Sequence, residues 1–122
     1  MKKLLLILFV FLFATEISIA SELRTTSATS VIIRTKILDS TTKAGKTGLA
    51  YNTSGLIIST ITDNEATATA YTVAGGTIET IATLGTYATP TATKCRFKEV
   101  DATNHPGVYE IQLANARFAV AG

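Results

Sequence analysis

Apolar and polar residues alternate in short runs from residue 30 onward. In the first run, residues 30–38, every second residue from Val31 to Ile37 shares one face, while Arg34 and Lys36 lie on the other. A period of two is typical of a half-buried β-strand. Threonine occurs 21 times between residues 25 and 103, and β-branched residues suit a pleated strand better than a helix. The pattern therefore predicts an all-β chain.

Further runs of the same kind predict the remaining strands. They are a short strand opened by Leu49 and Tyr51, then residues 56–61, 66–73, 77–84, 94–100 and 108–113. Turns are expected at 52–55, 62–65, 74–76 and 104–107, with loops at 39–48 and 85–92. The run 56–61 is the more apolar one and is expected to be central. The run 77–84 also suits a short helix, because its apolar residues recur every third position, but its neighbours favour a strand.

Six or seven strands in about 90 residues are typical of a sandwich or barrel. We predict one domain over residues 21–122, an antiparallel Ig-like β-sandwich of about seven strands. The last predicted strand ends at Leu113, nine residues before the end of the sequence. We therefore expect the sandwich to lack its last strand. The unpaired sheet edge would then bind a protein partner or a second copy.

The last two strands carry the clearest prediction of facing. Cys95, Phe97 and Glu99 share one face of their strand. In the final strand Tyr109, Ile111 and Leu113 are expected to face inward, and Glu110 and Gln112 outward. Cys95 is the only cysteine, so no disulfide within the chain is expected, and we interpret it as a small buried apolar residue.

The N-terminus follows the three-part pattern of a secretory signal peptide. Lys2 and Lys3 precede eleven apolar residues at 4–14, and Ser18 and Ala20 supply the small residues of a cleavage site. Glu16 ends the apolar run well short of the roughly 20 residues that span a membrane. We predict a signal peptide at 1–20, with a retained anchor as the alternative, and hence export to the periplasm or the extracellular space.

Charge argues against a nucleic-acid partner. Removing Lys2, Lys3 and Glu16 lowers the net charge from +2 to +1, and most basic residues are scattered. The exception is Lys94, Arg96 and Lys98, which alternate along one predicted strand. We interpret them as a solvated strand face, with a phosphate-binding stripe as the weaker alternative.

Two features invite a catalytic interpretation, and neither supports one. The segment 44–48, AGKTG, resembles the end of a phosphate-binding loop, but Ser40 stands where that motif needs glycine, and no helical pattern follows. His105, the only histidine, lies near Asp101 in a predicted turn, without a nucleophile motif. We predict no enzyme activity and no catalytic, cofactor-binding or metal-binding residues.

Weaker candidates have ordinary structural explanations. Asp63, Asn64 and Glu65 offer oxygen ligands to calcium, but three adjacent polar residues suit a hairpin turn better. Asn52 begins a formal glycosylation sequence, which matters only in a eukaryotic secretory route.

Tyrosines are the candidates for carbohydrate contact. Tyr51 and Tyr71 lie on predicted strands and are expected to pack in the core. Tyr87 lies in a loop and is the better candidate for an exposed contact.

The C-terminal segment NHPGVYEIQLANARFAVAG resembles small β-sandwich domains of phage and prophage proteins, including baseplate-associated and other tail-associated modules. Gly107, Val108, Tyr109, Leu113 and Gly122 carry this resemblance, supported by the early strand VIIRTKILDSTTKAGKTGLA and by TSGL. The resemblance spans residues 30–122 and implies a non-enzymatic virion-associated or host-attachment scaffold.

Two hypotheses follow, a phage or prophage structural module located in the virion and an exported adhesin-like or carbohydrate-binding domain. The signal-peptide pattern favours the second, because tail proteins assemble in the cytoplasm. We favour the first.

Overall fold

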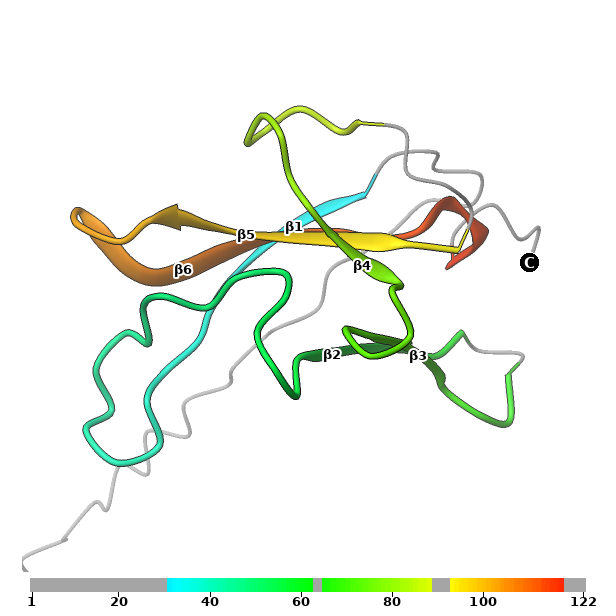
Figure 1. Ribbon diagram of the computed structural model, residues 1–122, viewed down its shortest axis with the longest axis horizontal. Helices are drawn as coiled ribbons and strands as arrows, with labels where there is room; N and C mark the ends of the chain where they lie inside the picture. Colours follow the sequence, from blue (N-terminus) through cyan, green and yellow to red (C-terminus); the bar gives the residue numbers. More distant parts are fainter. Residues whose placement is uncertain (1–30, 63–64, 89–92, 118–122) are drawn as a thin grey trace, which may run out of the picture.

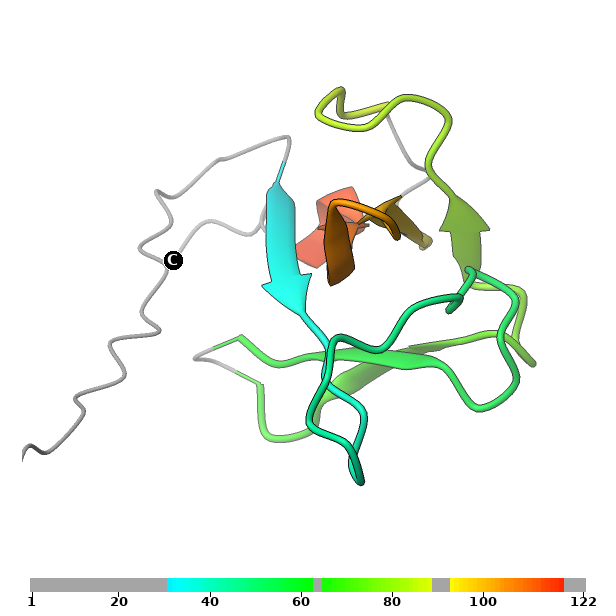
Figure 2. The same cartoon turned by 90° about the vertical axis from the view of Figure 1, so that its left-hand side faces the viewer.

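The computed structural model describes residues 31–62, 65–88 and 93–117, which form two β-sheets (Figure 1). The elements are β1 (Ile32–Lys36), β2 (Ile57–Thr60), β3 (Thr69–Thr72), β4 (Ile78–Thr80), β5 (Cys95–Asp101), β6 (His105–Gln112) and the 3-10 helix η1 (Asn115–Arg117). One sheet has the order β1-β6-β5-β4, and β2 and β3 form the other. Figure 2 shows the two sheets as separate layers. The predicted all-β class is confirmed.

Strand β6 is central to the larger sheet, where it pairs antiparallel with both β1 and β5. The β5–β6 hairpin turns at residues 102–104, because the Asp101 carboxylate accepts backbone hydrogen bonds from Thr103 and Asn104, both at 2.9 Å. The predicted turn at 104–107 is therefore placed too late, and His105 already belongs to β6. Gly107 lies inside the strand with a φ of 80°.

The expectation of a purely antiparallel fold is wrong at one sheet edge. Strand β4 pairs parallel with β5, Ile78 opposite Cys95 and Thr80 opposite Phe97. A parallel pair needs a long crossover connection, and the chain between β4 and β5 supplies it. Residues 81–88 of that connection arch over the larger sheet, on the side away from β2 and β3 (Figure 1). Of the ambiguous run 77–84, only residues 78–80 form a strand. Ile81 is buried where the crossover begins.

Two further strand predictions are wrong. Residues 49–51 form no strand, because their backbone groups bond to side chains: Leu49 N–H donates to the Tyr109 hydroxyl at 3.2 Å and Ala50 N–H to Thr53 Oγ1 at 2.8 Å. The apolar run 56–61 is not central. Its strand β2 belongs to the two-stranded sheet, where Ile57 is 60% exposed.

The core lies between the two sheets. Phe97 and Tyr109 stack with ring centroids 4.8 Å apart, and Cys95 is fully buried beside them. Ile58 and Tyr71 close this cluster from β2 and β3. The inward facing of Cys95, Phe97 and Tyr109 and the buried state of Tyr71 are confirmed, because alternate residues of each strand point into the space between the sheets.

Several sequence predictions lie outside the described residues. They are the signal peptide at 1–20, the mature N-terminus, the turn residues Asp63 and Asn64, and the segment 118–122 that would lead toward a further strand. Within the described residues, no helix is both long and apolar enough to cross a membrane.

Candidate interaction surface

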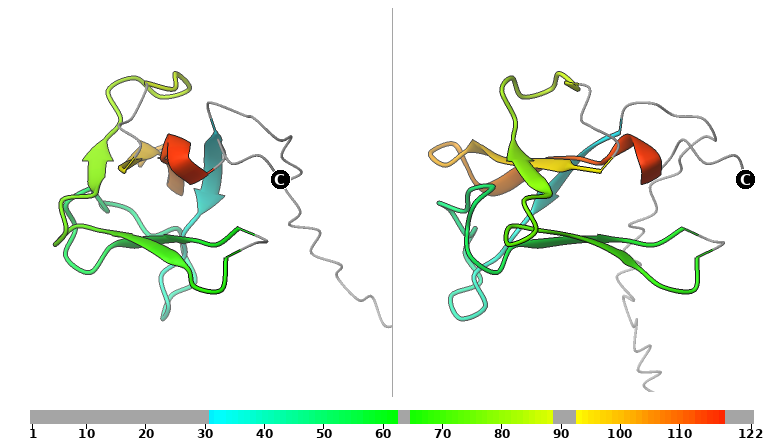
Figure 3. Two further views of the ribbon diagram at one scale, coloured as in Figure 1. Left: turned by 90° about the vertical axis from the view of Figure 1, so that its right-hand side faces the viewer. Right: turned by 45° about the vertical axis from the view of Figure 1, so that its right-hand side comes forward.

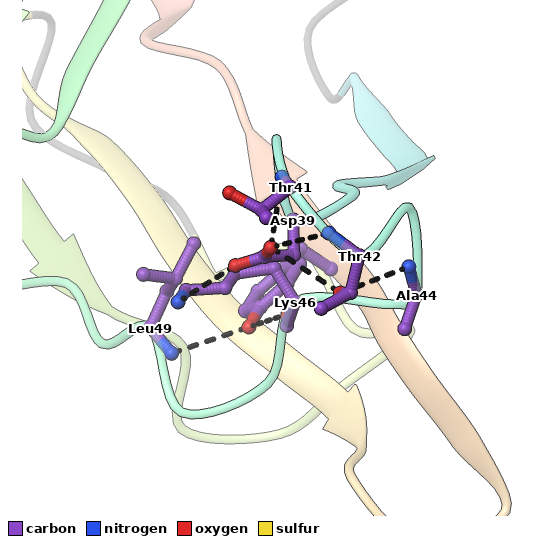
Figure 4. Close-up of polar contacts among 7 residues, drawn as sticks. Asp39, Thr41, Thr42, Ala44, Lys46 and Leu49 are labelled. Atoms are coloured by element: carbon purple, nitrogen blue, oxygen red, sulfur yellow. Dashed lines mark hydrogen bonds and ion pairs between the residues drawn. The ribbon is translucent and has the colours of Figure 1, made fainter.

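The loop that contains AGKTG is organised by one carboxylate (Figure 4). Asp39 Oδ1 accepts the backbone N–H groups of Thr41 and Thr42, both at 3.0 Å, and Asp39 Oδ2 lies 3.3 Å from Lys46 Nζ. The Thr42 and Thr41 backbone bonds lower the pKa of Asp39 from 3.8 to about 2, with a contribution from Lys46. The lysine of the phosphate-loop resemblance is thus paired with an acid of its own loop.

The same loop is anchored against β6. The Tyr109 hydroxyl donates to the Lys46 carbonyl at 2.6 Å and accepts from Leu49 N–H, while Lys46 N–H donates to the Ile37 carbonyl at 2.8 Å. Gly45 and Gly107 approach so closely that a Cβ on Gly107 would lie 2.6 Å from the Gly45 Cα. These contacts give both glycines a packing role, and they place the loop as a fixed cover on the end of the sheet.

A buried carboxylate occupies the opposite face of the larger sheet. Glu110 is fully buried, with Arg34 Nη2 at 3.1 Å and the Gly85 backbone N–H at 2.9 Å from its oxygens. Gln112, also fully buried, donates to Glu110 Oε1 at 3.2 Å and to the Thr86 carbonyl at 2.9 Å. Glu110 and Gln112 face away from the core as predicted, but this outer face is buried rather than exposed to solvent. Their face is covered by residues 81–88, which these side chains hold in place.

The basic stripe is covered by the same crossover. Arg96 donates to the Ala88 carbonyl at 2.5 Å, and Lys98 Nζ lies 3.5 Å from the Ala82 carbonyl. Lys94 and Arg96 both pair with Glu79, at 2.7 and 3.2 Å. Lys94 lowers the pKa of Glu79 by hydrogen bonding, with a smaller effect from Arg96. Lys94 and Arg96 are thus paired with an acid, whereas Lys98 makes one exposed contact, so only part of the stripe is the solvated face that the sequence predicts.

The remaining candidates for chemistry, His105 and Cys95, lie in different surroundings. His105 is exposed at the start of β6, opposite Asp101. Cys95 lies in the core, where burial raises the pKa of its thiol. In the described ranges, no group of three or more histidine, cysteine and carboxylate side chains is placed to hold a metal ion.

The tyrosine predictions are partly wrong. Tyr51 is 38% exposed in a turn, although the sequence favoured the core. Tyr87 is half-buried, with its hydroxyl 2.8 Å from the Leu113 carbonyl and 2.5 Å from Asn115 Oδ1. Burial raises the pKa of Tyr87 to about 12. Its hydroxyl bonds to residues at the junction with η1, so it is not free to contact a carbohydrate.

A pocket of about 320 Å³ opens beside η1, at the junction of the two sheets. Its lining includes Tyr71, Thr69, Thr77 and Arg117. Arg117 is paired with both carboxylate oxygens of Glu65, and its Nε donates to Thr60 at 2.8 Å. The guanidinium charge is therefore balanced by an acid. The pocket is lined by several threonine side chains, while Tyr71 is only 4% exposed.

The outer face of the β2–β3 sheet exposes apolar side chains within the described residues. Figure 3 shows this hairpin as its own layer, with one side turned away from the larger sheet. Ile57 and Ile61 are 60% and 62% exposed on that side, next to exposed Ser59 and Ala70. We call these four residues the hairpin surface. Singly exposed apolar residues are common, whereas larger exposed apolar patches often mark interaction sites.

Charge separates this surface from the rest of the molecule. Residues 47–62 and 66–78 contain no Lys, Arg, Asp or Glu. The edge strand β1 of the larger sheet, by contrast, carries Arg34 and Lys36, charges of the kind that protect strand edges from unwanted pairing. Sequence reasoning misses the hairpin surface, because the apolar run at 56–61 predicts a central strand. The uncharged stretch was the signal that could have revealed it.

Comparison with known proteins assigns no family to the chain: no family model, no curated protein and no solved structure matches it.

Proposed function

We propose that this chain is a non-enzymatic structural or interaction module that engages a protein partner through the hairpin surface. The observation that carries the proposal is the pair Ile57 and Ile61, exposed together on a sheet without charges. Burying two isoleucines on association is favourable by roughly 25 cal/mol per Å² of apolar area removed from water. The buried polar groups of the larger sheet support the same proposal, because their hydrogen bonds hold the crossover in place and so have a structural rather than a catalytic role.

The biological setting we propose is a phage or prophage virion, as the sequence resemblance implies. Gly107 and Tyr109, two of the residues that carry the resemblance, have architectural roles in the contact between β6 and the Asp39 loop. The resemblance therefore concerns fold rather than chemistry. The finer comparison with Ig-like sandwiches, completed by one more strand from a partner, belongs to the same proposal.

The second candidate is an exported adhesin-like or carbohydrate-binding domain. Two observations favour it, the signal-peptide pattern at 1–20 and the hydroxyl-lined pocket beside Tyr71. The threonine hydroxyl groups that line this pocket are suited to a sugar, which presents several hydrogen-bonding groups.

Localisation of the tagged full chain in its natural host tests both candidates. After prophage induction, we expect the wild-type chain to sediment with particles, and the variant with Ile57→Lys and Ile61→Lys to be lost from them. Leu38→Lys, at a 51% exposed apolar residue outside the hairpin, is the matched control. Recovery only as a cleaved, soluble periplasmic or extracellular protein would reject the virion proposal and support the second candidate.

A further inference from the structure

The free edge of β2 offers backbone groups in a defined pattern. On the far side of β3, Thr72 N–H donates to Thr77 Oγ1 at 2.7 Å, and the Thr72 carbonyl accepts from Thr77 N–H at 3.1 Å. Both backbone groups of Thr72 therefore point away from its cross-strand partner Ile57. Hydrogen-bonded and non-hydrogen-bonded pairs alternate in an antiparallel ladder. Ile57 and Ser59 thus direct their N–H and C=O groups to the open edge.

The same edge is self-complementary in its side chains. If a second β2 strand pairs antiparallel about Ser59, Ile57 lies opposite Ile61 of the partner copy, and Ser59 lies opposite its own equivalent. Both isoleucines are exposed in the single chain. In this register each of them contacts an isoleucine of the partner copy, so two apolar pairs form. A two-fold axis requires such self-matching, because each copy presents the same patch.

The two outer edges of the larger sheet lack this property, and the outer edge of β3 is already occupied at Thr72 by its bonds to Thr77. An antiparallel β1 pair centred on Arg34 would place two arginines opposite each other, and a β4 pair centred on Glu79 would place two glutamates opposite each other. Like charges directly opposite each other destabilise a strand pair. Strand β2 has no charged residue, so its self-pairing carries no such cost.

We propose that two copies of this chain pair through β2 into a continuous β3-β2-β2-β3 sheet, with Ser59 at the two-fold axis. This inference rests on the proposed interaction role of the hairpin surface, and it names the first partner as a second copy. A two-stranded sheet is marginal alone, whereas four strands with one face on the core are not. The paired sheet would bury both isoleucine pairs and satisfy the edge groups of Ile57 and Ser59.

Cysteine crosslinking of the full chain tests the register. Paired residues on adjacent strands have Cα atoms about 5.5 Å apart, within the range that a disulfide spans. Ser59→Cys should therefore form a disulfide dimer on mild oxidation, seen on a non-reducing gel at twice the 12.9 kDa chain mass. Ile57→Cys is the matched control, because residue 57 and its equivalent would be about 13 Å apart, four residues out of register. The native Cys95 is fully buried, so the wild type gives the background.

We expect about tenfold more dimer from Ser59→Cys than from Ile57→Cys. An equimolar mixture of Ile57→Cys and Ile61→Cys should also crosslink, although neither variant does so alone. This mixture keeps the test valid if Ser59→Cys folds poorly. Equal crosslinking by Ser59→Cys and Ile57→Cys, or a wild type that light scattering shows to be monomeric, would overturn the pairing. Loss of particle binding by the double lysine variant, alongside a monomeric wild type, would leave the proposed function standing and remove only this inference.

Discussion

The two sheets of this protein differ in how much of each face is buried. At β5 and β6 the larger sheet is covered on both sides, by the core around Phe97 on one face and by the crossover over Glu110 on the other. The β2–β3 sheet is covered on one side only, where Ile58 and Tyr71 join the core. Its other side presents Ile57 and Ile61. The difference separates the residues that maintain the fold from those available to a partner.

Polar chemistry follows the same division. On the larger sheet Arg34, Glu79, Arg96 and Glu110 all form ion pairs that fix neighbouring segments. Buried polar groups of this kind specify one arrangement, because any slip leaves them without partners. The β2–β3 strands contain only Ile, Ser, Thr, Ala and Tyr. Without charged side chains, these strands can pack against a wider range of surfaces. The following predictions test whether this division is real.

Truncating the core should separate the two sheets most clearly. Phe97→Ala removes a ring that stacks on Tyr109 and should reduce the free energy of unfolding by about 4 kcal/mol. Ile57→Ala, on the hairpin surface, should change it by less than about 0.5 kcal/mol at low protein concentration. Urea denaturation followed by circular dichroism measures both. Similar losses for the two variants would show that the hairpin surface contributes to stability, contrary to the comparison.

Two glycines with nearly the same backbone angle provide the second test. Gly107 has a φ of 80° and Gly55 a φ of 81°. A Cβ at Gly107 would lie 2.6 Å from the Ile37 carbonyl oxygen, whereas nothing lies within 4 Å at Gly55. Gly55→Ala should cost about 1 kcal/mol from the left-handed conformation alone. Gly107→Ala should cost about 3 kcal/mol, because backbone overpacking is added.

Equal unfolding midpoints for Gly107→Ala and Gly55→Ala would contradict this prediction. Such a result would mean that the Asp39 loop moves away from β6 at little cost, and that the end of the larger sheet is not rigidly covered.

Much of the fold could be predicted from alternation, because the inward faces of β5 and β6 are a local property of each strand. The positions of Cys95, Phe97 and Tyr109 followed directly from it. The facing of Glu110 was also predicted correctly, but its environment was not. Whether the second face of a strand meets water depends on a distant segment, here Gly85. Strand alternation carries no information about that segment.

The candidate site was harder to predict for the same reason. An apolar run such as residues 56–61 is equally consistent with a central strand and with an exposed strand that binds a partner. Only the tertiary structure shows that Ile58 is buried while Ile57 is exposed. The pairing of Lys46 with Asp39 likewise required the loop geometry, although both residues were visible in the sequence.

Removing one carboxyl charge from each part of the molecule gives a third test. Glu110→Gln should reduce the free energy of unfolding by about 2 kcal/mol, because a fully buried acceptor of several hydrogen bonds loses its ion pair. Glu65→Gln, near the β2–β3 turn, should have a smaller effect, since its carboxylate is partly exposed. Thermal unfolding at pH 7 compares them. A larger loss for Glu65→Gln would reverse the assignment of the stabilising ion pair to the covered sheet.

Acid titration makes the finest distinction between the two regions. The hydrogen bond from Arg117 lowers the pKa of Glu65 from 4.5 to about 2, and the pKa of Asp39 is lowered to a similar value. A depressed carboxyl pKa in the folded state gives stability that is present above the unfolded pKa and is lost as the pH falls through the folded value. Stability should therefore decline between pH 4.5 and about 2.

Urea midpoints at successive pH values across this range measure the effect in the wild type, Glu65→Gln and Asp39→Asn. Each variant should show a shallower decline than the wild type, and the double variant the shallowest. If the hairpin and the Asp39 loop are independent, the two reductions in slope should add, because separated sites that share no partner behave additively. An unchanged slope in Glu65→Gln would mean that Arg117 does not hold the β2–β3 turn against η1 in solution. The hairpin surface would then lack the support that keeps Ile57 and Ile61 in place.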